Sequence, residues 1–177
     1  MVNEDGYLKL IDYGLAKILK ESDVAQTYCG TPEYIAPEMV QQQGHDRMVD
    51  WWALGVLTFE LIVGVTPFYN KSWQLMIDKI VRCNVAFPDP KFKINISASG
   101  QDFIRALLKK DPTWWIGCAN DVDEIFEHPW LQNVTKEDLL KKNIVPPFLP
   151  SVKDPETMYP KDLMERKNLG ETYIPYA

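Results

Sequence analysis

The stretch DWWALGVLTFELIV, residues 50–63, decides the fold class of this chain. Its apolar run is shorter than the ~18–20 residues that a helix needs to span a bilayer. It therefore predicts a helix that is buried on most sides within a protein core. Two acids, Asp50 and Glu60, stand inside the run. Because a buried carboxylate is unfavourable unless it is paired, both are candidates for a specific role.

The composition is that of an ordinary globular protein. The chain has 177 residues, 46% of them hydrophobic and 25% charged, which is enough for one domain or for part of a larger one. The net charge of −6 gives no basic footprint for nucleic acid and favours a basic partner or substrate. Cys29, Cys83 and Cys118 are too few and too scattered for a disulfide framework or a zinc cluster. We expect reduced thiols in an intracellular, cytoplasmic protein.

Further helices are expected on both sides of residues 88–90, where PDP breaks the chain. Residues 72–82 and 97–110 have apolar positions at helical spacing, and residues 121–130 form a shorter helix that Pro129 stops. Thr135 and Asp138 resemble a capping box. The remaining expectations are a turn at 4–7, a strand at 7–11, an extended loop over 20–47 and a proline-rich tail after Pro146.

Three stretches carry a resemblance when they are taken together in this order: DYG (12–14), CGTPEYIAPE (29–38) and DWWALGVLTFE (50–60). They resemble the D-F-G motif, the A-P-E motif and the following helix of the large lobe of a eukaryotic protein kinase, most closely of the AGC group. The resemblance implies a mainly α fold: a kinase large lobe truncated before the D-F-G strand, with one short β-hairpin and a C-terminal tail. It places the large-lobe fragment at residues 1–130, the activation segment at 12–38 and the tail region at 131–177.

The resemblance also assigns roles at the nucleotide. Asp12 would bind the Mg²⁺ that bridges the phosphates of ATP, although an acid at this position by itself also suits a simple turn. Ile11 would lie near the nucleotide base, and the packing of Tyr13 would help to set active and inactive states. Thr31 would hydrogen-bond the catalytic aspartate of a loop that this sequence does not contain.

Other residues of the segment resemble regulatory and substrate-binding positions. Thr27 resembles the activation-loop phosphorylation site, where a phosphate would meet basic groups such as Lys17. Ser22 is a rival acceptor or a solvated loop serine. Glu60 resembles the acid that pairs with arginine before the acceptor Ser or Thr, or it simply faces solvent. The residues that would shape the pocket for the residue after the acceptor are Tyr28, Pro32 and Ile35.

Two acids have structural roles by resemblance. Asp50 resembles the acid at the start of its helix that holds the backbone of the catalytic loop. Glu38, the acid of A-P-E, pairs in these kinases with an arginine after the helix that ends at DP. Trp115 stands at that arginine position, so Glu38 is expected to lack its partner, and an arginine at 115 is expected to stabilise the fold.

Several catalytic parts of the family are absent from the sequence. It contains no G-x-G-x-x-G loop, no V-A-I-K lysine and no H-R-D-x-x-x-x-N loop. All of these precede D-F-G in a kinase, so Met1 is expected to lie inside a longer protein. The resemblance implies protein substrates with basic residues before the acceptor, an upstream activating kinase, and ATP with Mg²⁺. The chain alone is expected to be inactive; the alternative is a non-catalytic, pseudokinase-like binding module. In either case we expect no nucleic-acid partner and no membrane span.

Overall fold

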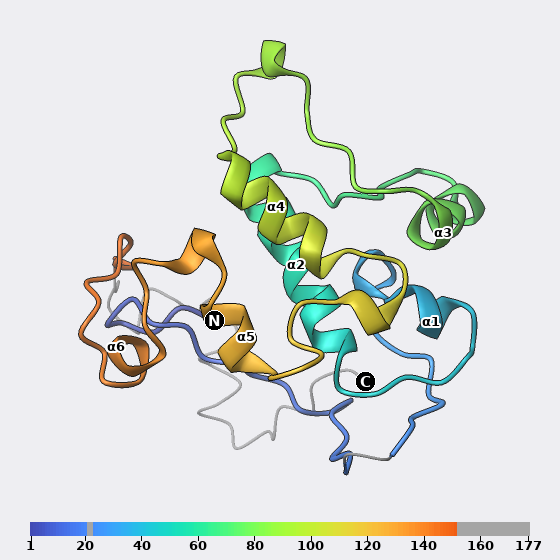
Figure 1. The fold of residues 1–177 in the computed structure, drawn as a ribbon, viewed down its shortest axis with the longest axis horizontal. Helices are drawn as coiled ribbons and strands as arrows, with labels where there is room; N and C mark the ends of the chain where they lie inside the picture. Colours follow the sequence, from blue (N-terminus) through green and yellow to red (C-terminus); the bar gives the residue numbers. More distant parts are fainter. Residues whose placement is uncertain (21–22, 152–177) are drawn as a thin grey trace, which may run out of the picture. The chain divides into compact units, whose positions relative to one another are not determined.

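The computed structural model describes residues 1–20 and 23–151, and its regular structure is helical (Figure 1). The chain forms two compact units, one of residues 12–141 and one that joins residues 1–11 to the segment from residue 142 onward. In chain order the elements are η1 (Pro32–Tyr34), α1 (Pro37–Val40), α2 (Val49–Val63), α3 (Trp73–Arg82), η2 (Pro90–Phe92), α4 (Ala98–Leu107), η3 (Pro112–Trp114), α5 (Val122–Phe126), η4 (Pro129–Leu131) and α6 (Lys136–Leu140).

Helix α2 is the central element of the larger unit and confirms the helix predicted at residues 50–63. Its buried side is formed by Trp52, Gly55, Val56 and Phe59, which recur at helical spacing. Gly55 permits close packing on α4, because a Cβ atom added there would lie 2.8 Å from the Cβ of Leu107. The two helices share the most extensive helix–helix contact of the described chain and cross side by side (Figure 1).

The core gathers around the indole of Trp52, which is fully buried. Its ring stacks on Phe68 with centroids 5.7 Å apart and lies tilted against Trp115 at 5.8 Å. Aromatic pairs in such arrangements add to the stabilisation that comes from area burial alone. Met76 and Ile80 of α3 and Ile104 of α4 belong to the same core, so it joins the three helices that the hydrophobic pattern predicts.

The ends of the helices follow their capping residues. Ser97 accepts a hydrogen bond from the Gly100 N–H at 3.0 Å, and α4 then ends at Leu107, three residues before the predicted end. Thr135 accepts from the Asp138 N–H at 3.0 Å and donates to its carboxylate at 2.6 Å, which confirms the predicted cap of α6.

The segment over residues 20–47, predicted as an extended loop, contains two short helical elements. Helix η1 begins at Pro32 and α1 at Pro37, both at positions where a proline's missing N–H costs no helical hydrogen bond. An antiparallel bridge between Ala25 and His45 closes the segment around them. The expected helix over 121–130 is divided in a similar way, since α5 ends at Phe126 and η4 starts at Pro129.

The smaller unit contains the predicted turn. Gly6 has a φ of 80°, and a single antiparallel bridge joins Val2 to Leu8 in place of the strand expected at 7–11. A two-stranded ladder without a third strand is marginal, which accounts for the short pairing. Tyr7 donates its hydroxyl to the Ile144 carbonyl at 2.6 Å, and the Lys142 ammonium contacts the Asp5 carboxylate.

Candidate functional site

Asp12 lies in a turn and is exposed to solvent. It has a φ of 63°, and its Oδ1 accepts a hydrogen bond from the Gly14 N–H at 3.2 Å, the geometry of an Asx turn. The strand expected just before Asp12 does not form, and Leu8, Leu10 and Ile11 are exposed. The local chemistry still suits a cation, since the second carboxylate oxygen has no protein partner among the described residues. Those residues contain no cluster of three or more metal-binding side chains.

Thr27 and the residues around it lie in an open part of the segment. Thr27 and Tyr28 are exposed, and no hydrogen bond within the described residues joins Thr27 to Lys17. Ser22 lies outside the described residues. Cys29 is free, as are the other two cysteines.

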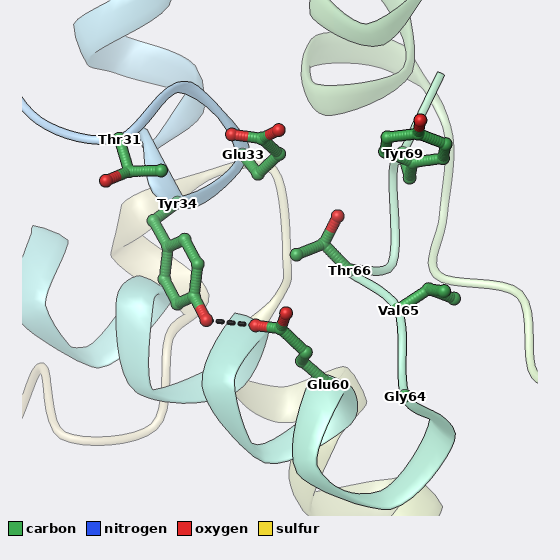
Figure 2. Close-up of a pocket in the computed structure, with 8 residues that line it drawn as sticks. All are labelled: Thr31, Glu33, Tyr34, Glu60, Gly64, Val65, Thr66 and Tyr69. Atoms are coloured by element: carbon green, nitrogen blue, oxygen red, sulfur yellow. Dashed lines mark hydrogen bonds between the residues drawn. The ribbon is translucent and has the colours of Figure 1, made fainter. Parts of the chain in front are cut away.

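A hollow of about 350 Å³ lies beside η1 and the end of α2, and we call it the acidic hollow (Figure 2). Its two carboxylates come from different elements, Glu33 from η1 and Glu60 from α2. The residues that line it are Thr31, Glu33, Tyr34, Glu60, Gly64, Val65, Thr66 and Tyr69.

Tyr34 holds Glu60 in place within the acidic hollow. Its hydroxyl donates to the Glu60 carboxylate (Figure 2). Burial together with this bond raises the pKa of Tyr34 to about 12, so the phenol keeps its proton and remains a donor. Neither Glu33 nor Glu60 pairs with a cation within the part of the chain that the structure describes. The acidic hollow therefore offers two carboxylates to a cationic ligand.

One predicted substrate residue, Glu60, lines the acidic hollow, and so does Thr31, which was predicted to contact the catalytic aspartate. The hollow also contains Glu33 and Tyr34, two residues that sequence reasoning missed. Pro32 and Ile35 are not among the residues that line the hollow, and Ile35 is 4% exposed within the core. The sequence signal for Glu33 and Tyr34 was the run PEY, which places an acid and a tyrosine two and three residues after Thr31.

Glu38 is buried in α1, with 8% of its surface exposed. Its Oε2 has no hydrogen-bond partner among the described residues, and burial, reinforced by nearby Asp46, raises its pKa to about 7. Trp115 is 1% exposed, and its indole N–H donates to the Lys109 carbonyl at 2.5 Å rather than to Glu38. Asp50, by contrast, is exposed in the first turn of α2, so the expectation that it is buried is wrong.

Lys110 is a half-buried cation that the sequence did not single out. Its ammonium donates to the Ile80 carbonyl at 2.7 Å and lies 3.9 Å from the ring centroid of Phe68 and 4.8 Å from that of Trp52. Burial lowers its pKa to about 7.

Comparisons with known proteins agree with this arrangement. The family model for the protein kinase domain matches residues 1–131. The chain is 37% identical to the serine/threonine-protein kinase YPK2/YKR2 of Saccharomyces cerevisiae, covering 86% of this chain and 22% of the relative. It is 37% identical to serine/threonine-protein kinase Sgk1 of Xenopus tropicalis (89% and 37%) and 39% identical to cAMP-dependent protein kinase catalytic subunit 3 of Drosophila melanogaster (86% and 25%).

The chain thus spans between about a fifth and two fifths of the length of these relatives. No described helix is both long enough and apolar enough to cross a membrane. The matched domain, the D-Y-G and A-P-E motifs in their expected order and the helical fold around α2 all agree. This chain belongs to the protein kinase family, in the AGC group of serine/threonine kinases.

Proposed function

We propose that this chain is the substrate-binding part of a kinase that transfers the γ-phosphoryl group of ATP to Ser or Thr in proteins with basic residues before the acceptor. The observation that carries the proposal is the acidic hollow, where Glu33 and Glu60 face no cation within the described chain. Carboxylates bind the planar guanidinium of arginine through paired, charge-assisted hydrogen bonds. A basic residue of the substrate is therefore the ligand that this hollow suits.

Each residue around the hollow has a distinct part in this proposal. Tyr34 orients Glu60 through its hydroxyl, which leaves the carboxylate directed at the incoming cation. Thr31 also lines the hollow and would hydrogen-bond the catalytic aspartate of the H-R-D loop. Tyr28, Pro32 and Ile35 would shape the site of the residue after the acceptor, with exposed Tyr28 touching the substrate and buried Ile35 supporting the wall from the core.

The nucleotide would engage Asp12. Mg²⁺ at kinase sites uses one or two carboxylates together with substrate phosphates, and the open oxygen of Asp12 fits that donor set. When bound, Mg·ATP supplies the phosphoryl group and the charge compensation for its transfer. Ile11 is exposed and would offer apolar surface to the base. We assign residues 1–130 to the large lobe, 12–38 to the activation segment and 131–177 to the tail.

Regulation is proposed at Thr27. Its exposed hydroxyl is accessible to an upstream kinase, and a phosphate there would add nearly two negative charges. Lys17, also exposed in the same segment, would be one of the cations that such a phosphate recruits. Glu38 and Asp50 are proposed to support this segment and the start of α2.

The 177-residue chain assayed by itself is proposed to bind substrates without phosphorylating them. Its sequence contains neither the phosphate loop nor the H-R-D loop that the transfer requires, whereas the acidic hollow is intact. The same observation favours a second candidate, a pseudokinase-like module that binds basic proteins and performs no transfer.

Peptide binding tests the proposal. A fluorescent peptide with arginine two and three residues before a serine should bind the chain, and Glu60→Gln should weaken binding by about tenfold, as loss of ~1.4 kcal/mol predicts. Glu127→Gln, an exposed acid of the same unit that lies outside the hollow, is the matched control and should leave binding unchanged. Equal affinity for a peptide with glutamate in place of arginine would refute basic-substrate recognition. A radiolabelled ATP assay should show no phosphoryl transfer by the chain. Transfer that is lost in the Asp12→Ala variant would contradict this expectation.

A further inference from the structure

A long excursion between α3 and α4 carries a distinctive tip. Figure 1 shows the chain leaving α3, turning at η2 and returning to the start of α4. The Asp89 carboxylate accepts a hydrogen bond from the Lys91 N–H at 2.9 Å and caps the turn, which Lys93 ends in a left-handed conformation with φ of 56°. The turn is therefore locally ordered while it extends away from the helices.

The side chains of this tip are basic and aromatic. Phe92 is 63% exposed and is the only aromatic residue of the sequence with a lysine on each side. The ammonium of Lys91 lies 5.2 Å from the ring centroid, and its contact with Asp89, at 3.4 Å, is between two exposed groups. Such exposed ion pairs are weak, so both lysines remain available to another anion. We call residues 91–93 the Lys-Phe-Lys tip.

The acidic hollow is complementary to this tip in charge and in apolar surface. Its carboxylates, Glu33 and Glu60, form no ion pair within the described residues, and they line the hollow together with Val65 and Tyr69, which are 54% and 52% exposed. Its volume of about 350 Å³ exceeds the ~150 Å³ of a cavity that holds benzene. The hollow can therefore take a phenyl ring together with a lysine ammonium.

We propose that the Lys-Phe-Lys tip of one copy of this chain docks into the acidic hollow of a second copy. Phe92 would pack on Val65 and Tyr69, and the flanking lysines would pair with Glu33 and Glu60. A buried aromatic anchor with charged neighbours is the usual pattern of a strong interface contact. The inference rests on the proposed function in one respect, because the tip occupies the same hollow as a basic substrate and would compete with it.

The geometry of such a contact has a consequence for assembly. Tip and hollow are different surfaces of the same unit, so two copies can exchange tips reciprocally in a closed two-fold dimer or join head to tail. Either assembly should form as the concentration rises. High salt should weaken it, because exposed charges are screened.

Sedimentation velocity of the full chain tests the proposal. Phe92→Ser and the double variant Lys91→Glu/Lys93→Glu should each weaken self-association by about tenfold or more, the change expected from loss of ~1.4 kcal/mol. The matched control is Phe148→Ser, an exposed phenylalanine with no lysine neighbour, which should associate like the wild type. Phe92 is exposed in a loop, so its loss should leave the far-ultraviolet circular dichroism unchanged.

Mixing provides a second readout. At a concentration where the wild type associates, a tip variant (Phe92→Ser) and a hollow variant (Glu33→Gln/Glu60→Gln) should each be mainly monomeric alone. When mixed, they should form a 1:1 complex that grows no further. Association of Phe92→Ser like the wild type, through the exposed Leu57 and Leu61 of α2 for example, would overturn the proposal. So would a monomeric wild type, or tip-dependent binding to anionic lipid vesicles without self-association.

Peptide arms separate this inference from the proposed function. A peptide of residues 88–96 should bind the monomeric tip variant and be displaced by the arginine peptide. Binding of the arginine peptide without binding of the tip peptide would refute the docking while leaving basic-substrate recognition intact. Binding of the tip peptide alone would refute basic-substrate recognition and retain the docking.

Discussion

Replacing Glu38 with glutamine should stabilise the protein at alkaline pH and leave it unchanged at acidic pH. Glu38 is 8% exposed, its Oε2 has no described hydrogen-bond partner, and burial raises its pKa from 4.5 to about 7. Below pH 4.5 the carboxyl is protonated in both the folded and the unfolded chain. Between pH 4.5 and 7 only the unfolded chain ionises, so the free energy of unfolding falls as the pH rises.

The magnitude follows from the size of this pKa change. Each pKa unit corresponds to about 1.4 kcal/mol, so the rise from 4.5 to about 7 removes ~3 kcal/mol of stability once the pH exceeds 7. Domains of this kind are stable by only ~5–15 kcal/mol, so such a loss is large. Glutamine has nearly the same shape and no titrating proton. The Glu38→Gln variant should therefore gain ~2–3 kcal/mol over the wild type at pH 8 and little at pH 5.

Urea unfolding followed by tryptophan fluorescence at pH 5 and pH 8 measures the difference. Lys110 also titrates near pH 7, but its contribution is common to both proteins and cancels in the comparison. A Glu38→Gln variant that loses the same stability as the wild type between pH 5 and pH 8 would show that Glu38 is not the titrating group.

This substitution is a sharper test than Trp115→Arg, the change that the resemblance suggests. Trp115 is 1% exposed, packs against Trp52 and donates its N–H to the Lys109 carbonyl. An arginine at 115 would lose that packing and leave the Lys109 carbonyl without this donor, typically at a cost of several kcal/mol. Any gain from a new partner for Glu38 would be mixed with those losses.

Two further changes probe the core around α2. Lys110→Met keeps an apolar side chain against Trp52 and Phe68 but removes an amine whose pKa in the folded protein, about 7, lies below its usual 10.5. The free energy of unfolding of the wild type should therefore rise between pH 7 and pH 10. Urea unfolding at several pH values should show that this rise is missing in the variant. Gly55→Ala would place a Cβ atom 2.8 Å from the Leu107 Cβ, so α2 and α4 must separate. Thermal unfolding should show a loss of ~1–3 kcal/mol in the free energy of unfolding. An unchanged unfolding midpoint would contradict the close packing of the two helices.

Local patterns were sufficient for most of the helical architecture. Helix α2 was evident from its long apolar run, and α3 and α4 from apolar residues at helical spacing, because burial of one helix face leaves a periodic mark in the sequence. The cap at Thr135 was equally readable, since its hydrogen bonds reach only three residues along the chain. The prediction of a strand at 7–11 was wrong because a strand needs a neighbouring strand to pair with, and the local sequence pattern does not reveal one.

The sequence by itself determined the family and the order of the motifs, and it identified Asp12, Glu38 and Glu60 as acids with specific roles to be sought. Residue identity and spacing carry that information. Only the tertiary structure joined Glu33 and Tyr34 to Glu60, directed the Trp115 N–H to Lys109 and placed the Lys110 ammonium beside two aromatic rings. In each case the partners come from different elements or from a turn whose direction is set by packing. Hydrogen bonds and pKa values depend on distances and burial, and these are fixed only when the helices pack together.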